Sequence, residues 1–217
     1  MTAIEKVKLA RDPKRPHLKD FIREICSDFE ELHGDRLVND DRGLVGGFGT
    51  IGSEKVLILG HNKGATVEEN MAANFGMANP DGYRKAMRLA ALAEKFHVPV
   101  VVVVTGEGGS GGALAIAVGD RILMMENAVY SVISPEGCAG ILWRDGKKAP
   151  EAAEALKITA HDLVTLGAID EIVKEPAGGA QKNHRLACAN VKKAILKALK
   201  ELKGLAPDAL LDARYAK

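Results

Sequence analysis

The chain has 217 residues, of which 30 are Lys or Arg and 29 are Asp or Glu, giving a formal net charge of +1. This balance argues against a partner recognised by bulk charge, such as nucleic acid or a membrane surface. Charged residues throughout the N-terminus argue against a secretory signal, and the longest apolar runs, 98–104 and 113–118, are too short to cross a membrane. We therefore expect a cytoplasmic protein with one large domain.

Hydrophobic periodicity predicts an α/β order of elements. Apolar positions at helical spacing predict a helix over 16–33 that Gly34 ends, and strands over 44–51 and 55–60 flank a Gly52-Ser53 turn. The further predicted elements are, in chain order, a loop over 65–79 with at most one helical turn, a helix over 81–96, a strand ending at 104, a glycine-rich loop, a helix over 112–119, strands over 121–125 and 128–133, helices over 150–156 and 159–166, a strand over 169–173 and a helix over 182–202. We expect a mobile tail after Gly204.

The glycine-rich loop is the most informative segment. Five glycines lie within the seven residues 106–112, between a run of valines and a helix of small apolar residues. A strand that leads through such a turn into a helix presents unpaired backbone N–H groups at the positive end of the helix dipole. These groups stabilise an anion, either a bound phosphate or an oxyanion that forms during reaction.

Three functional interpretations fit this loop, beside a purely structural turn. Residues 106–111 match the dinucleotide pattern G-x-G-x-x-G, but the acids that follow, Asp120 and Glu126, come too early to hold a ribose. Residues 108–112 match the nucleophile elbow G-x-S-x-G around Ser110. The downstream pairs that this second interpretation would need are Asp145 with His161 or Asp170 with His184. The third interpretation is an oxyanion hole made of backbone groups alone.

The rest of the sequence favours the third interpretation. No His, Cys or acidic cluster has metal-ligand spacing, and no Walker-type loop occurs. Cys26, Cys138 and Cys188 are far apart and form no C-x-x-C pair, as expected in a reducing compartment. Chemistry that relies on backbone donors would leave a sequence of this kind.

Long motifs along the chain are similar to those of one enzyme family. They are 11–16 (RDPKRP), 31–36 (ELHGDR), 45–47 (VGG), 60–64 (GHNKG), 74–77 (NFGM), 82–86 (GYRKA), the glycine loop through 119–121 (GDR), 130–139 (YSVISPEGCA), 141–143 (ILW) and 175–180 (EPAGGA). In this order they resemble the alpha subunits of bacterial acetyl-coenzyme A carboxylase carboxyltransferases, which belong to the crotonase-like superfamily.

The resemblance implies the fold and the reaction. The fold would be the ClpP/crotonase spiral of strand-strand-helix units, formed by a single carboxyltransferase domain over 1–217 with an N-terminal helical segment 1–34 and a C-terminal helix and tail 182–217. The reaction would move a carboxyl group from carboxybiotin, on a separate carrier protein, to acetyl-coenzyme A, giving malonyl-coenzyme A for fatty acid synthesis. A non-catalytic assembly subunit, another crotonase-like acyl-coenzyme A enzyme and a thioester-directed serine hydrolase remain as alternatives.

The resemblance also implies site residues and partners. Gly111 and Gly112 match the glycine pair whose N–H groups form an oxyanion hole, and substrate binding is expected at Gly108, Gly109, Lys63 and Arg84. The implied partners are a beta subunit with a zinc ribbon, a biotin carboxyl carrier protein and a biotin carboxylase, with an alpha2beta2 arrangement and ATP bound only elsewhere in the holo-complex. No metal is expected in this chain.

Two departures from the family pattern are visible. Relatives carry a further strand, a loop and a long helix where this chain runs directly from His97 into Val98, so one unit of the spiral is shortened. Basic family positions after Lys63-Gly64 are replaced here by Ala65, Val67, Ala72 and Ala73. If those charges hold coenzyme A phosphates in the family, this chain should bind the coenzyme more weakly or use other contacts.

Overall fold

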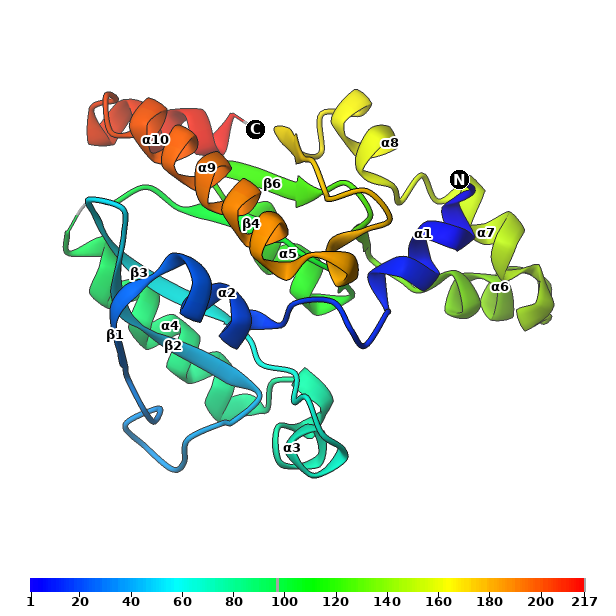
Figure 1. The fold of residues 1–217 in the computed structure, drawn as a ribbon, viewed down its shortest axis with the longest axis horizontal. Helices are drawn as coiled ribbons and strands as arrows, with labels where there is room; N and C mark the ends of the chain where they lie inside the picture. The colour runs from blue at the N-terminus through cyan, green and yellow to red at the C-terminus, as the bar shows by residue number, and fades with distance from the viewer. Residues whose placement is uncertain (97, 217) are drawn as a thin grey trace. The chain divides into compact units, whose positions relative to one another are not determined.

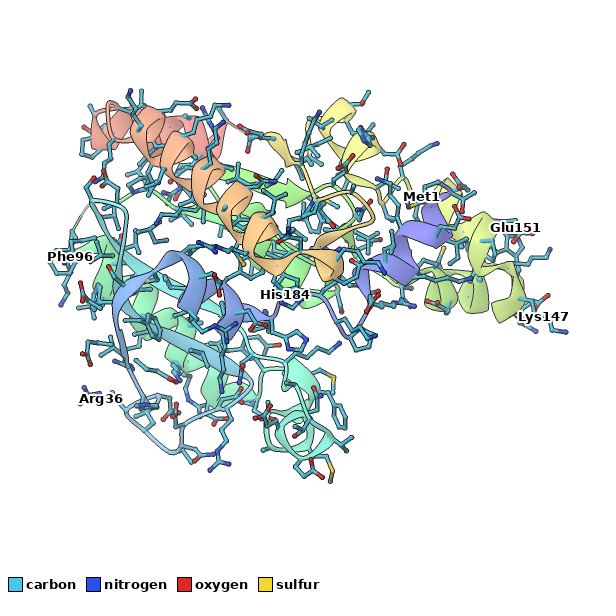
Figure 2. The ribbon with its side chains drawn as sticks, in the orientation of Figure 1. Met1, Arg36, Phe96, Lys147, Glu151 and His184 are labelled. Carbon is cyan, nitrogen blue, oxygen red and sulfur yellow. The ribbon has the colours of Figure 1, made fainter. Side chains whose placement is uncertain are left out.

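The computed structural model describes residues 1–96 and 98–216. The chain forms two compact units, one made of Met1–Arg15 with Pro99–Lys217 and the other of Pro16–Val98. Each unit has its own strands and its own covering helices, and each is considered separately below (Figure 1). Figure 2 shows the side chains on the same ribbon. The junction between the units falls at the shortened site, and His97 itself lies outside the described residues. The single-domain organisation stays a prediction.

The Pro16–Val98 unit is built on an antiparallel sheet of order β1-β2-β3. Its elements are α2 (Leu18–Ile25), β1 (Ser27–Glu31), β2 (Leu44–Ile51), β3 (Glu54–His61), α3 (Val67–Ala72), the short 3-10 turn η1 (Asn74–Gly76) and α4 (Pro80–Glu94). Helix α4 packs against β2 and β3 (Figure 1). Gly46 of β2 permits this contact, because a side chain there would collide with Leu89, which is fully buried.

The predicted helix over 16–33 is wrong in its second half. The helix ends at Ile25, and the chain then forms β1 as an edge strand antiparallel to β2, with Glu30 opposite Phe48. Phe29 and Leu32 continue the helical spacing of apolar residues, but pairing with β2 overrides that local pattern. The strands predicted over 44–51 and 55–60 and the helix over 81–96 are confirmed within a few residues.

The unit formed by Met1–Arg15 and Pro99–Lys217 contains two small parallel sheets, of order β4-β6-β8 and β5-β7. Its elements are α1 (Ala3–Ala10), β4 (Val101–Val104), β5 (Glu107–Gly109), α5 (Gly111–Ala117), β6 (Arg121–Met125), β7 (Val129–Ser131), α6 (Pro135–Trp143), η2 (Gly146–Lys148), α7 (Ala149–Ala155), α8 (Ala160–Thr165), β8 (Glu171–Val173), η3 (Ala180–Lys182), α9 (His184–Leu202) and α10 (Pro207–Tyr215).

Helix α9 is the main cover of the larger sheet in this unit. It contacts β4, β6 and β8. In Figure 1 the orange helix lies over the green strands β4 and β6. Its inward positions, among them Val191 and Leu202, are buried, as are Leu123, Met124 and Met125 of β6. This alternation of parallel strands and helices confirms the predicted α/β class.

Two elements of this unit differ from expectation. The segment after Gly204 is not a mobile tail but contains α10, in which Leu210 is buried and Arg214 forms an ion pair with Asp120. Residues 135–143 form α6, which was not predicted although Ser134 and Pro135 are a typical helix start: the Ser134 hydroxyl accepts a hydrogen bond from the Gly137 N–H. Among the described residues, no helix is both long and apolar enough to cross a bilayer.

Candidate active site

The first part of the glycine-rich segment is a strand rather than the loop that the sequence predicts. Glu107–Gly109 form β5, which pairs in parallel with Val129–Ser131 of β7, and the Ser110 N–H then donates to the Ser131 carbonyl at 3.2 Å. Helix α5 begins directly afterwards at Gly111. The predicted strand-to-helix passage is therefore present, with a second short strand between the valine strand and the helix.

Packing explains some of the glycines in this segment but not others. A Cβ at Gly108 would lie 2.9 Å from Ile116 Cδ1 of α5 and 3.3 Å from Val104 Cγ1, so this glycine lets the helix pack closely on the strands. A Cβ at Gly111 or Gly112 would meet no atom within 4 Å, and neither residue has a positive φ. Neither packing nor backbone conformation thus explains a glycine at these two positions.

Gly111 and Gly112 make helix α5 less stable than alanine residues at the same positions would. Glycine is less favourable than alanine in a helix by about 1 kcal/mol. What two glycines provide instead is access, because Gly111 is exposed and Gly112 half-buried with open space around both. The first N–H groups of a helix lack partners within it, and the Ser110 side chain does not cap α5. Glycines at these two positions therefore keep side chains away from the start of the helix, where the first backbone donors lie.

Ser110 lies in a strained backbone conformation between the strand and the helix. Its φ of 54° and ψ of −134° belong to a region that residues other than glycine seldom occupy. This conformation turns the chain sharply, so that β5 and α5 can both pack in place. The Ser110 side chain is exposed, and of the histidines proposed as its partners, His184 Nε2 is bonded to the Lys14 carbonyl at 2.6 Å and His161 lies exposed on α8.

The carboxylates proposed for the hydrolase interpretation also have structural roles. Asp170 accepts the Ile122 N–H at 2.7 Å, and Asp145 accepts the Lys147 N–H at 2.9 Å. The dinucleotide interpretation meets a similar obstacle, because residues 107–109 are extended and paired instead of forming a phosphate loop. The geometry thus agrees best with backbone donors.

An N-terminal arginine supports the glycine-rich segment from outside. Arg11, just after α1, donates to both carboxylate oxygens of Glu107 at 2.7 Å and also to Glu136 at the start of α6, at 2.8 Å. The bond from Arg11 lowers the pKa of Glu136. Glu107 is therefore a structural acceptor, and Arg11 connects β5 with α6. The sequence interpretation did not single out Arg11 or Glu136, although the helix-start signal at Ser134-Pro135 could have located Glu136.

A second arginine holds the end of the valine strand. Arg15 donates to the Thr105 carbonyl at 2.7 Å and forms a two-pronged ion pair with Glu175 at 2.7 and 2.9 Å. The Glu175 side chain is wholly buried and accepts further bonds from the N–H groups of Asn127 and Ala180. Burial raises the pKa of Glu175, but the bonds from Arg15 and these N–H groups outweigh it and the pKa is lowered.

Tyr130 fixes helix α5 from the opposite side. Its hydroxyl donates to the Ala113 carbonyl at 2.8 Å, in the first turn of the helix, while the backbone of Tyr130 lies opposite Gly108 in the β5-β7 ladder. Tyr130 thus holds the first turn of α5, and Arg11 holds β5, the strand that directly precedes Ser110 and the two glycines. Fixed surroundings of this kind keep a pair of hydrogen-bond donors in position before a substrate binds.

The remaining two predicted binding residues, Lys63 and Arg84, lie in the Pro16–Val98 unit. Lys63 is exposed after β3. Arg84 lies on α4 and donates to Asp35 at 2.7 Å. Hydrogen bonds from the Leu37 and Val38 N–H groups, together with the bond from Arg84, lower the pKa of Asp35. Arg84 thus has a structural partner, with 38% of its side chain still exposed.

Comparison with known proteins assigns the family. The family model described as "Acetyl co-enzyme A carboxylase carboxyltransferase-like" matches residues 1–104 and 97–217. The chain belongs to this carboxyltransferase family. The resemblance drawn from the sequence motifs is thereby confirmed, and transfer of a carboxyl group is the reaction class of the family.

Curated relatives with high identity are all named acetyl-coenzyme A carboxylase carboxyl transferase subunit alpha. A protein from Thermus thermophilus is 49% identical, over 99% of this chain and 81% of its own length. The Geobacter metallireducens protein is 47% identical over 97% of this chain and 78% of its own length. The protein from Prochlorococcus marinus is 47% identical over the whole chain and 78% of its own length.

Solved structures share the fold at low identity. Transcarboxylase 12S matches with a TM-score of 0.58 and 18% identity, over 88% of this chain and 42% of that one. The beta subunit of geranyl-coenzyme A carboxylase from P. aeruginosa matches with a TM-score of 0.55 and 16% identity, over 87% and 41%. The predicted crotonase-like fold is confirmed.

The alignments also locate the shortened unit. The alignment with the Thermus relative spans 253 positions, whereas this chain has 217 residues, so at least 36 aligned positions have no counterpart here. The family model matches in two pieces that meet at residues 97–104. The Thermus relative thus has at least 36 aligned positions that this chain lacks, and the two pieces of the family match meet directly before and within β4.

Proposed function

We propose that this chain is the alpha subunit of an acetyl-coenzyme A carboxylase carboxyltransferase, which forms malonyl-coenzyme A as the first step of fatty acid synthesis. The observation that carries the site assignment is the open space around Gly111 and Gly112, two helix-start glycines that packing does not require. Family membership and the names of the relatives support the reaction and the substrate.

The proposed role of the chain's own residues is to stabilise negative charge on an oxygen. The methyl proton of the acetyl thioester would pass to the ureido nitrogen of biotin once that nitrogen has released carbon dioxide, and the negative charge would move to the thioester oxygen. The N–H groups of Gly111 and Gly112 would donate to this oxygen, and the dipole of α5 would add to the effect. Gly108 and Gly109 would line the approach, while Lys63 and Arg84 would contact the coenzyme.

Carboxybiotin, on a separate carrier protein, would supply the carboxyl group. A pair of backbone N–H donors would be enough to stabilise the charge on the thioester oxygen, so this role needs no side-chain acid or base in this chain. Among the described residues, no group of three or more His, Cys, Asp or Glu side chains could hold a metal ion. The zinc ribbon and a second oxyanion hole are assigned to the beta subunit.

The proposed partners are this beta subunit, the biotin carboxyl carrier protein and the biotin carboxylase, in a cytoplasmic alpha2beta2 assembly. The role proposed for this chain covers the thioester oxygen alone, so the beta subunit would complete the site. The proposal is tested by assaying the purified chain with malonyl-coenzyme A and a biotin derivative, alone and with a beta subunit. We expect negligible transfer by the chain alone and robust transfer by the complex. Robust turnover without the beta subunit would refute the shared site, and no turnover with a competent beta subunit would refute the function.

A further inference from the structure

Two consecutive residues of β7 hold the backbone on either side of the glycine pair 111–112. The Ser131 carbonyl accepts a hydrogen bond from the Ser110 N–H at 3.2 Å, directly before the pair. The Tyr130 hydroxyl donates to the Ala113 carbonyl at 2.8 Å, directly after the pair. The two glycines thus lie between two bonds that come from one strand. The first is a backbone bond, so the second is the one that a side chain controls.

Helix α5 is held in place by little burial of its own. Of its 7 residues, all of them within the described part of the chain, Ala113 is the buried one, and Leu114 is 72% exposed. The two glycines at its start lower its stability, and a helix this short is not stable by itself in water. The position of its first turn therefore depends on the hydrogen bonds that neighbouring elements give it.

The side chain that gives this bond is itself fixed. The backbone of Tyr130 pairs with Gly108 in the β5-β7 ladder, and a Cβ at Gly108 would lie 3.6 Å from Tyr130 Cδ2. The ring thus lies against β5, while its hydroxyl reaches α5. Burial raises the pKa of Tyr130, so the hydroxyl stays a neutral donor at neutral pH. A phenylalanine at this position would keep the ring contact and remove only the donor.

The orientation of the first turn decides where the donors at 111 and 112 point. Backbone N–H groups of a helix are directed along its axis toward the N-terminus, so a tilt of the first turn changes their direction. An oxyanion hole stabilises the transition state only when its donors are aimed before the charge forms. Small displacements of groups around reacting atoms therefore lower the rate of the chemical step.

We propose that Tyr130 is a positioning residue for carboxyl transfer, whose hydroxyl acts through the Ala113 carbonyl to set the direction of the N–H groups of Gly111 and Gly112. This inference rests on the proposed function, because it concerns the same pair of donors. Tyr130 acts only through α5 and is given no contact with the substrate. The rate of the chemical step should therefore depend on a hydroxyl that the substrate does not touch.

Amide hydrogen exchange of the full chain tests the hold of Tyr130 on α5 without any need for activity. In Tyr130→Phe the amides of residues 114–117 should exchange at least about threefold faster, because the helix opens more easily when it loses one hydrogen bond. Tyr83→Phe is the matched control, since Tyr83 lies on α4 and is 57% exposed, and it should leave these amides unchanged. Unchanged exchange in Tyr130→Phe would overturn the proposal.

Turnover by the chain assembled with a beta subunit separates positioning from a merely structural role. With malonyl-coenzyme A and a biotin derivative, Tyr130→Phe should lower kcat at least about threefold while KM for malonyl-coenzyme A changes less than about twofold. The reason is that the donors act on charge that forms only during the reaction. A kcat that falls by less than about threefold would overturn the proposal, whether or not KM rises. Tyr83→Phe should leave both constants unchanged.

The double variant Tyr130→Phe/Gly112→Val shows whether the tyrosine acts through the donors. Because Gly112→Val already blocks a donor, adding Tyr130→Phe should lower kcat less than about twofold further. An additional loss as large as that of Tyr130→Phe alone would mean that the hydroxyl acts elsewhere, and would overturn the proposal. Near-normal turnover of Gly112→Val would refute the oxyanion hole itself. An impaired Gly112→Val with an unimpaired Tyr130→Phe would refute only the role of Tyr130.

Discussion

Arg15 and Glu175, 160 residues apart in sequence, form a two-pronged ion pair whose side chains are 4% and 0% exposed. The pair joins the N-terminal segment to the turn after β8, and Arg15 also holds the Thr105 carbonyl before β5. Sequence motifs that resemble the family at 11–16 and 175–180 thus meet in one buried cluster. The physical role of this cluster is to hold in place the backbone that leads into the glycine-rich segment.

Arg15→Met should destabilise the protein strongly. The substitution leaves the Glu175 carboxylate buried without its charged partner, which typically costs about 3–5 kcal/mol in the free energy of unfolding. Urea unfolding of the variant and the parent measures this loss. The double variant Arg15→Met/Glu175→Gln is the control, because it removes the buried charge and should recover part of the stability. A loss below about 1 kcal/mol in the single variant would contradict the assigned role.

Acid should destabilise the Pro16–Val98 unit through Asp40. Burial would raise the pKa of this carboxyl, but bonds from the Lys85 ammonium, the Gly34 N–H and His33 lower it from 3.8 to about 2. A lowered pKa in the folded state contributes stability above pH 4, and this contribution is lost as the pH falls from about 4 to about 2.

Asp40→Asn isolates this contribution. The stability difference between parent and variant should be large at pH 6 and should shrink as the pH approaches 2, because the parent carboxyl is then protonated. Thermal unfolding followed by circular dichroism at both pH values gives the comparison. A difference that stays constant across this range would show that Asp40 does not titrate as described.

The periodic, locally determined elements were predictable from the sequence. The strand over 121–125 and the long helix that begins near 182 have strong apolar patterns, and both are found within two residues of their predicted bounds. Local sequence patterns do not predict an element whose conformation depends on pairing with a segment that is distant in the sequence. Ser27–Glu31 has no alternation of apolar residues and becomes a strand only because β2 offers its edge.

Some features of the candidate site could likewise be predicted from the sequence, and others could not. The glycines and their passage into a helix were visible in the sequence, but Arg11, Glu136 and Tyr130 act through contacts over 17 to 125 positions. No spacing rule connects residues so far apart. The space around Gly111 and Gly112 likewise depends on the packing of β5, β7 and α5, so it could be found only in three dimensions.

The C-terminal helix should contribute to stability through Arg214. Its guanidinium donates to both oxygens of Asp120 at 2.7 and 2.8 Å, and Asp120 is buried at the start of β6, where it also accepts the Val100 N–H at 2.6 Å. Arg214→Ala leaves this buried carboxylate with fewer partners, so we expect a loss of about 1–3 kcal/mol. Chemical unfolding checks the value, with Arg185→Ala on α9 as a surface control. Equal stability of the two variants would contradict the role of the pair.

Ser110 should matter for backbone conformation and not as a nucleophile. Ser110→Ala should leave transfer by the assembled complex within about twofold, whereas loss of a covalent nucleophile costs several orders of magnitude. Ser110→Gly should raise the free energy of unfolding by up to about 1 kcal/mol, because it relieves a strain of about 1–3 kcal/mol at φ 54° and the greater entropy of the unfolded chain offsets only part of this gain. Labelling of Ser110 by a fluorophosphonate probe would count against this account.

If the backbone N–H groups of Gly111 and Gly112 form an oxyanion hole, a bulky side chain at Gly112 should lower the rate of carboxyl transfer. Gly112→Val fills the open space over the donors, and losing one such donor typically lowers the rate about 100- to 1000-fold, or roughly 2.7–4 kcal/mol. Gly140→Val is the matched control, because Gly140 is also a helical glycine whose Cβ would meet no atom within 4 Å.

The most direct measurement is therefore the turnover rate of carboxyl transfer by the Gly112→Val and Gly140→Val chains, each assembled with the beta subunit and checked for assembly by size-exclusion chromatography. We expect normal assembly of both variants, a turnover rate about 100- to 1000-fold lower for Gly112→Val and near-normal turnover for Gly140→Val. Near-normal turnover of a correctly assembled Gly112→Val complex would place the chemistry elsewhere.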